Sequence, residues 1–71
     1  MQVYQFNAEL KSQLLNSKTI TQLSKELEIS RSYLTMILNG KYTITKLMAF
    51  YIVYNCDKNA QVEDYFIRKE K

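Results

Sequence analysis

A chain of 71 residues, 46% of them hydrophobic, has enough apolar material for one compact domain and too little for a second core. It has no histidine, one cysteine and one glycine, which argues against a catalytic triad, a tetrahedral zinc site and a glycine-rich phosphate-binding loop, and hence against an enzyme or a bound cofactor. The net charge is +3, and the whole excess lies between Lys18 and Lys46, where five basic residues accompany two acidic ones; this is expected of a segment that approaches phosphate groups, and equally of a solvated surface with a chance imbalance.

The first predicted element is an amphipathic helix near the N-terminus. Its apolar stripe, at intervals of three, four and four residues, consists of Val3, Phe6, Leu10 and Leu14. This spacing is typical of one face of an α-helix, so we expect a helix from about residue 3 or 7 to residue 16. The polar residues 16–18 are predicted to end it.

The second predicted helix begins at Thr19 and ends near Leu27. Thr19 and Gln22 have the spacing of a capping box, in which the Thr19 hydroxyl accepts a hydrogen bond from the Gln22 amide and the Gln22 side chain reaches back. Leu23 and Leu27 then lie one turn apart, and we expect both to be buried.

A third helix is predicted from Arg31 to Asn39. Ser30 is a good N-cap residue for it. Its buried stripe, at helical spacing, is formed by Leu34, Ile37 and Leu38. Gly40, the only glycine of the chain, stands where a residue in the left-handed conformation commonly ends a helix.

Two more helices are predicted, at about residues 43–55 and 59–69. The first is apolar almost all round, which indicates burial on more than one side. The second is expected to bury Val62 and Phe66. Together the five elements predict an all-α fold, a compact bundle of about five short helices that forms a single domain over residues 1–71.

A β-hairpin is the competing interpretation of the segment around Gly40. Asn39-Gly40 is also the strongest two-residue hairpin signal, and residues 41–45 alternate like a strand. A hairpin here would give a winged or α+β domain. The serine cap and the helical stripe upstream favour the all-helical alternative, because the residues before Asn39 do not alternate cleanly.

Two short helices separated by about three residues form a helix-turn-helix. The segment over residues 19–41, TITQLSKELEISRSYLTMILNGK, resembles the helix-turn-helix of lambdoid phage repressors and Cro proteins, and of the bacterial regulators that share their fold. In that pattern Leu23 and Leu27 lie on the scaffold helix and Ile29 in the turn. Residues 44–66 are similar to the family's remaining helices, so the resemblance covers about two-thirds of the chain and implies a DNA-binding function.

Three positions depart from the family pattern. Glu28 stands where the tight turn usually has glycine; if φ is positive there, glutamate costs about 1 kcal/mol. Ile20 stands where the family often has a glutamine that touches phosphate, which puts that contact in doubt. Ser24 replaces the usual alanine, a small-for-small change that packing should accept.

Helical geometry predicts which residues of the third helix could contact DNA bases. At about 100° per residue, the buried stripe leaves the opposite side exposed. The candidate base-contacting residues are Arg31, Ser32, Tyr33, Thr35 and Met36. A helix inserted N-terminus first brings Arg31, Ser32 and Tyr33 closest to base edges. Arg31 is the strongest candidate, since it can donate two hydrogen bonds to guanine O6 and N7, although a solvated charge is the alternative.

A second group of residues is predicted to contact phosphates. The family's roles, carried over, assign this contact to Asn39, Lys41, Tyr42 and Thr43, beside the end of the recognition helix. For Asn39, capping of the helix is the alternative role. Thr19 and Gln22 lie at the exposed N-terminus of the second helix and could bind phosphate there.

The fourth predicted helix carries more apolar residues than one buried face requires. If Ile44, Leu47, Phe50, Tyr51 and Tyr54 face the core, other apolar residues remain toward solvent. The residues assigned to this dimer or partner surface are Met48, Ile52, Val53 and Tyr65. The alternative is that the C-terminal helix folds over them.

The sequence therefore favours a sequence-specific DNA-binding transcriptional regulator, a repressor of phage or mobile-element type. A homodimer would place two recognition helices in successive major grooves of double-stranded DNA, about 34 Å apart. The alternative function is a small protein of the same fold, such as a phage-encoded inhibitor or adaptor, that binds and modulates a protein partner.

The expected location is the cytoplasm of a bacterial or phage-infected cell. The longest apolar run, Leu47 to Tyr54, is far shorter than the roughly 20 residues of a membrane span, so no membrane association is expected. The N-terminus shows no signal-peptide pattern. Cys56 is the only cysteine, cannot form an internal disulfide, and is expected to pack as a small hydrophobic residue.

Overall fold

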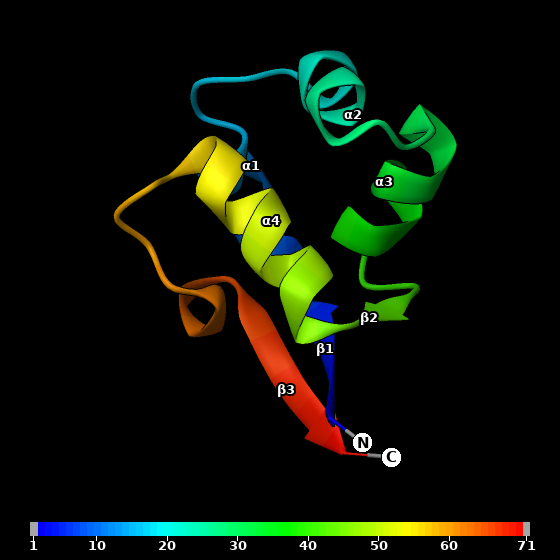
Figure 1. The fold of residues 1–71 in the computed structure, drawn as a ribbon, viewed down its shortest axis with the longest axis vertical. Coiled ribbons are helices and arrows are strands. Elements are labelled where there is room, and N and C mark those ends of the chain that lie inside the picture. The colour runs from blue at the N-terminus through cyan, green and yellow to red at the C-terminus, as the bar shows by residue number, and fades with distance from the viewer. Residues whose placement is uncertain (1, 71) are drawn as a thin grey trace.

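The computed structural model describes residues 2–70, and over this range the chain forms helices together with a three-stranded antiparallel sheet (Figure 1). The elements in chain order are β1 (Gln2–Phe6), a 3-10 turn (Ala8–Leu10), α1 (Lys11–Leu14), α2 (Ile20–Leu27), α3 (Arg31–Leu38), β2 (Thr43–Ile44), α4 (Lys46–Cys56), a second 3-10 turn (Val62–Asp64) and β3 (Phe66–Glu70). The all-α prediction, with its bundle of five helices, is therefore wrong, and the fold is α+β.

The sheet joins segments from the two ends of the sequence. Its strand order is β2-β1-β3, so the N-terminal strand lies in the middle. β1 pairs with β3 along its whole length, from Gln2 opposite Glu70 to Phe6 opposite Phe66. β2 adds a short pairing on the other side, with Tyr4 opposite Ile44. Figure 1 shows α4 crossing this sheet, with α2 and α3 packed together on one side.

The predicted N-terminal helix is wrong over its first part. The segment Val3-Tyr4-Gln5-Phe6 is a strand whose Tyr4 and Phe6 side chains are buried in the core. β-branched and aromatic residues favour a strand, and β1 gains hydrogen bonds from both neighbours, neither of which is local in sequence. The alternative start at residue 7 is closer to the structure, because the 3-10 turn Ala8–Leu10 and the helix α1, which buries Leu14, follow one another from residue 8 to residue 14.

The predicted fifth helix is also wrong, although its buried residues are correct. Val62 and Phe66 are both buried, but they belong to a 3-10 turn and to strand β3 respectively. The Phe6 ring packs edge-on against Phe66, with centroids 5.1 Å apart, and lies parallel to the Tyr65 ring at 6.5 Å. This aromatic cluster fixes β3 against β1.

The hairpin interpretation around Gly40 is wrong in its pairing and right about a strand downstream. The chain enters Gly40 from helix α3, so Asn39-Gly40 does not join two strands. Thr43 and Ile44 do form a strand, but it pairs with β1. The alternation of residues 41–45 therefore correctly indicated a short strand, whose partner strand is about 40 residues away in sequence.

Helix α4 (Lys46–Cys56) packs against the core, but the face that it buries is opposite to the predicted one. Its buried residues are Ala49, Ile52 and Val53. Its exposed apolar residues are Leu47, Phe50, Tyr51 and Tyr54. The predicted partner surface is therefore wrong at Ile52, Val53 and Tyr65, which are buried; Met48 is half-buried against the core. Small Ala49 lets α4 approach the elements that it packs against, α2, β1 and the second 3-10 turn.

Cys56, at the end of α4, packs against the core as a small hydrophobic residue, as expected. It is half-buried, and this burial raises the pKa of its thiol, while the Lys18 ammonium acts in the opposite direction. The thiol therefore stays protonated near neutral pH, which suits an apolar packing role.

Candidate nucleic-acid interface

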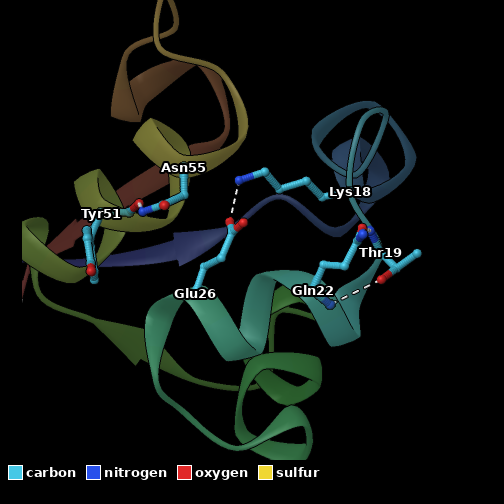
Figure 2. A network of polar contacts seen from close by, with 6 residues as sticks. All are labelled: Lys18, Thr19, Gln22, Glu26, Tyr51 and Asn55. Carbon is cyan, nitrogen blue, oxygen red and sulfur yellow. Dashed lines mark hydrogen bonds and ion pairs between the residues drawn. The ribbon is translucent and has the colours of Figure 1, made fainter.

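Helix α2 begins with the predicted capping box. The Thr19 Oγ1 atom accepts a hydrogen bond from the Gln22 backbone N–H at 3.1 Å, and Gln22 Oε1 accepts one from the Thr19 N–H at 2.9 Å (Figure 2). Lys18, in the loop before α2, forms an ion pair with Glu26 two turns along the helix, as Figure 2 shows. These contacts hold the first turn of α2 at the surface, with the Gln22 amide N–H₂ and the Thr19 hydroxyl hydrogen still able to donate.

The turn between the two helices places Glu28 in the left-handed conformation, with φ 57°. The Ile29 N–H donates to the Ser24 carbonyl at 3.1 Å and the Glu28 N–H to the Lys25 carbonyl at 3.3 Å, the pattern of a Schellman motif. Glu28 thus occupies the position that favours glycine. Ser24 fits its buried site, because its hydroxyl donates to the Thr21 carbonyl at 2.9 Å.

Replacing Glu28 with glycine is expected to raise the free energy of unfolding by about 1 kcal/mol. The substitution removes the steric cost of a Cβ atom at positive φ, which exceeds the extra entropy that glycine brings to the unfolded chain. Urea denaturation followed by circular dichroism measures the change. Lys25→Gly, at an exposed position inside α2, is the matched control and should lower stability by about 1 kcal/mol. A loss of stability in both variants would contradict the argument.

Helix α3 (Arg31–Leu38) forms as predicted. The Ser30 hydroxyl accepts a hydrogen bond from the Tyr33 N–H at 3.0 Å and caps the N-terminus. The inner face is fully buried against α2 and β1 and consists of Leu34, Ile37 and Leu38. Gly40 ends the helix at φ 76°, with its N–H donating to Ile37 and the Lys41 N–H to Met36.

The outer face of α3 carries the residues predicted to contact bases. Arg31, Ser32 and Tyr33 are exposed at its N-terminal end. Thr35 and Met36 are partly buried, so they present only part of each side chain to a ligand. Arg31 lies beside α2, where its Nη1 is 3.5 Å from the Thr21 hydroxyl oxygen, at the limit of a hydrogen bond. Its guanidinium group therefore keeps most of its donors available.

The C-terminal end of α3 is held by two residues that sequence reasoning missed. The Gln5 side chain, on β1, donates to the Gly40 carbonyl at 2.8 Å. Lys11, on α1, donates to the Asn39 side-chain oxygen at 3.2 Å. This contact leaves the Asn39 amide N–H₂ group to donate elsewhere and places the Lys11 ammonium at the C-terminal end of α3. No local pattern marks Gln5 or Lys11, because both lie about 30 residues before their partners.

Three of the residues predicted to contact phosphate lie beside Tyr33, which is predicted to contact bases. The rings of Tyr33 and Tyr42 are 5.7 Å apart and tilted by 40°. A surface hollow between them is lined by Tyr33, Lys41, Tyr42 and Thr43. All four side chains are exposed, so α3 and the following segment form one continuous polar and aromatic surface with a lysine in it. Thr19 and Gln22 lie apart from this hollow, at the start of α2.

A model of the helix-turn-helix family matches residues 11–50, which is more than half of the chain and includes α2, α3 and the turn between them. The chain belongs to this family, that of lambdoid phage repressors and Cro proteins. It is thus a helix-turn-helix DNA-binding regulator, and its ligand is double-stranded DNA. No curated protein and no solved structure matches the chain.

The regulatory family is not typically enzymatic, and its DNA-binding unit lies within the matched segment. In residues 2–70, no helix has the length and hydropathy needed to cross a bilayer. The same residues hold no group of three or more His, Cys, Asp or Glu side chains placed to bind a metal ion.

Proposed function

We propose that the protein is a sequence-specific transcriptional repressor of phage or mobile-element type, which acts on DNA in the bacterial cytoplasm and places α3 in the major groove. The observation that carries the proposal is the two-sided character of α3. Its inner face is closed by buried aliphatic side chains, while its outer face offers Arg31 at one end and Lys41 just beyond the other. This arrangement suits base contacts flanked by phosphate contacts.

The base contacts are assigned to the outer face of α3. Arg31 donates two hydrogen bonds to a guanine, and Ser32 and Tyr33 approach the neighbouring base edges, since all three are exposed at the end of the helix that enters the groove first. The exposed parts of Thr35 and Met36 contact a thymine methyl group.

The phosphate contacts are assigned to both ends of the helix-turn-helix. Beyond α3, Asn39, Lys41, Tyr42 and Thr43 donate to one stretch of backbone, and Lys11 adds its charge through its contact with Asn39. At the start of α2, Thr19 and Gln22 hold a further phosphate, where the helix N-terminus adds its positive potential.

Selection of bound sequences from a random duplex pool, followed by fluorescence anisotropy at increasing salt, tests this function. We expect one enriched motif, and a plot of log affinity against log salt with a slope of about −2 for each protomer, because Lys11 and Lys41 each release counterions from phosphate. Binding without an enriched motif would contradict a sequence-specific repressor. Absence of binding to any duplex at low salt would contradict DNA binding by this surface.

The second candidate function is modulation of a protein partner by a helix-turn-helix protein. The exposed apolar residues of α4 favour it, since they could contact another protein. The salt titration separates the two functions, because a protein that acts only on a protein partner would bind no duplex at low salt.

A further inference from the structure

The segment beyond α3 that carries most of the proposed phosphate contacts, residues 40–43, is attached to strand β1. Gln5 Nε2 donates a hydrogen bond of 2.8 Å to the Gly40 carbonyl, and this contact is partly buried. Gln5 is also the residue opposite Thr43 where β1 pairs with β2. One residue of β1 therefore contacts both ends of the segment, although 35 residues of sequence separate it from Gly40.

The turn at Gly40 packs closely against β1. Gly40 has φ 76°, and a Cβ atom placed on it would lie 3.4 Å from the Phe6 carbonyl oxygen and 3.6 Å from Gln5 Nε2. A side chain at this position would thus meet the strand directly. The turn and the strand are in contact, so the position of residues 40–43 follows that of β1.

The backbone of the segment has few supports of its own. Lys41, Tyr42 and Thr43 are exposed, and the strand that follows, β2, is only two residues long. An exposed segment with so little backbone pairing opens at a low cost in free energy. A single partly buried hydrogen bond therefore has a large share in keeping the segment ordered.

We propose that Gln5 is a positioning residue for DNA binding, because its hydrogen bond to the Gly40 carbonyl holds residues 40–43 in the conformation that contacts phosphate. The inference rests on the proposed function, since Gln5 acts only through those phosphate contacts. A segment that is ordered before binding does not have to be ordered by DNA. Without the bond, the competent conformation is less populated, and the affinity falls by the same factor.

Lys11 reaches the same turn from α1, but its contact is of a different kind. Its ammonium donates to the Asn39 side chain at 3.2 Å in an exposed position, where a long side chain gains little from a fixed geometry. Lys11 also brings a charge that can bind phosphate itself. Gln5 is uncharged, so its contribution is the order of the segment, and this difference can be measured.

Anisotropy titrations with the selected duplex and a random duplex measure the contribution of Gln5. Gln5→Ala should weaken binding to both duplexes by about three- to tenfold, the effect of one lost hydrogen bond, and leave the base preference and the salt slope unchanged. Lys41→Ala removes a charge and should lower the slope by about 1. Gln2→Ala, at an exposed position on the same strand, is the matched control and should bind like wild type.

Gln5→Glu provides a measurement that a merely structural role would not change. Above its pKa, the introduced carboxylate has no proton to donate and repels the Gly40 carbonyl oxygen. Below its pKa, the neutral carboxyl group can donate to that oxygen in place of the amide. Thr43 and Ile67, the residues opposite it on the two neighbouring strands, are uncharged.

The pH profile is compared with that of Gln2→Glu, which adds the same charge to the same strand. At pH 8, Gln5→Glu should bind at least tenfold more weakly than Gln2→Glu, and this gap should narrow at least threefold at pH 5. The charged groups nearest in the fold are Lys11 and Lys41 at the end of α3, and Lys69 diagonally across β3. The chain has no histidine, so wild type should bind with nearly constant affinity over this range.

Amide hydrogen exchange of the free protein, followed by nuclear magnetic resonance, tests the ordering of the segment without DNA. In Gln5→Ala, the N–H groups of Gly40 and Lys41 should exchange about three- to tenfold faster than in wild type. Those of Ala49 and Val53, buried in α4, should exchange at the wild-type rate, which checks that global stability is unchanged.

The two measurements separate failure of this proposal from failure of the proposed function. If wild type binds no duplex, the proposed function is wrong, and hydrogen exchange alone decides whether Gln5 orders residues 40–43. A Gln5→Ala variant that binds and exchanges like wild type overturns the proposal. Equal acceleration of exchange in the turn and in α4 also overturns it, because Gln5 would then support only global stability. Weaker DNA binding with unchanged exchange would mean that Gln5 contacts DNA directly, which contradicts a positioning role.

Discussion

Ile52→Ala is expected to lower the free energy of unfolding by about 2–5 kcal/mol, whereas Leu47→Ala should change it by less than about 0.5 kcal/mol. Ile52 has no exposed surface and belongs to the buried hydrophobic core. Its truncation removes buried methyl groups and leaves a cavity in a domain of marginal stability. Leu47 is 79% exposed in the single chain, so its truncation removes little packing.

Urea denaturation followed by circular dichroism measures both changes. Val53→Ala, one residue further along and also buried, should behave like Ile52→Ala with a smaller loss, because fewer methyl groups are removed. Equal losses for Ile52→Ala and Leu47→Ala, or a larger loss for Leu47→Ala, would mean that the inward face of α4 is the one predicted from sequence.

The orientation of α4 could not be predicted from its sequence, because both of its sides are apolar. A helix with one polar face has a single way to pack, and the hydrophobic pattern then identifies it. In α4 the residues Leu47 and Phe50 are as hydrophobic as Ile52 and Val53, and Tyr54 adds a large aromatic ring on the same side, so amphipathicity gives no direction. The small side chain of Ala49, which allows close packing against α2 and β1, was the available signal for the buried side.

The strands at the two ends of the sequence, β1 and β3, were missed for a different reason. A strand is stabilised by its partner, and the partners β1 and β3 lie at opposite ends of the sequence. The spacing of Val3 and Phe6 also fits a helix, because an interval of three residues is helical. The secondary structure of such short apolar stretches is decided by pairing with a distant strand. The local spacing of apolar residues carries no information about that partner.

The helix-turn-helix itself was predictable because its signals are local. Thr19 and Ser30 cap helices through hydrogen bonds to residues three positions away, and Gly40 ends α3 through its own backbone conformation. The buried residues of α3 recur at helical spacing, so the residues on its exposed face could be predicted from them. The supports from Gln5 and Lys11 were not predictable, since they reach the end of α3 from distant elements.

Arg31→Ala is expected to weaken binding to the selected duplex by about 1–3 kcal/mol and to relax the base preference at one position. Arg31 is exposed at the N-terminal end of α3 and makes only the long contact to Thr21, so its removal leaves the fold intact. Lys41→Ala should weaken binding to all duplexes alike and reduce the salt slope by about 1, because a phosphate contact carries no base information. Anisotropy titrations with the selected duplex, single-base variants and a random duplex measure both effects.

Arg68→Ala is the matched arginine control, since Arg68 is also exposed but lies on β3, which β1 separates from β2 in the sheet. It should change neither affinity nor base preference. An equal loss of DNA affinity in Arg31→Ala, Lys41→Ala and Arg68→Ala would instead indicate a general effect of removing positive charge. If Arg31→Ala weakens every duplex equally, as Lys41→Ala does, then Arg31 contacts phosphate and another residue of α3 must select the base. If Arg31→Ala leaves affinity and preference unchanged while Lys41→Ala weakens binding, DNA lies against the end of α3 and its outer face does not enter the groove.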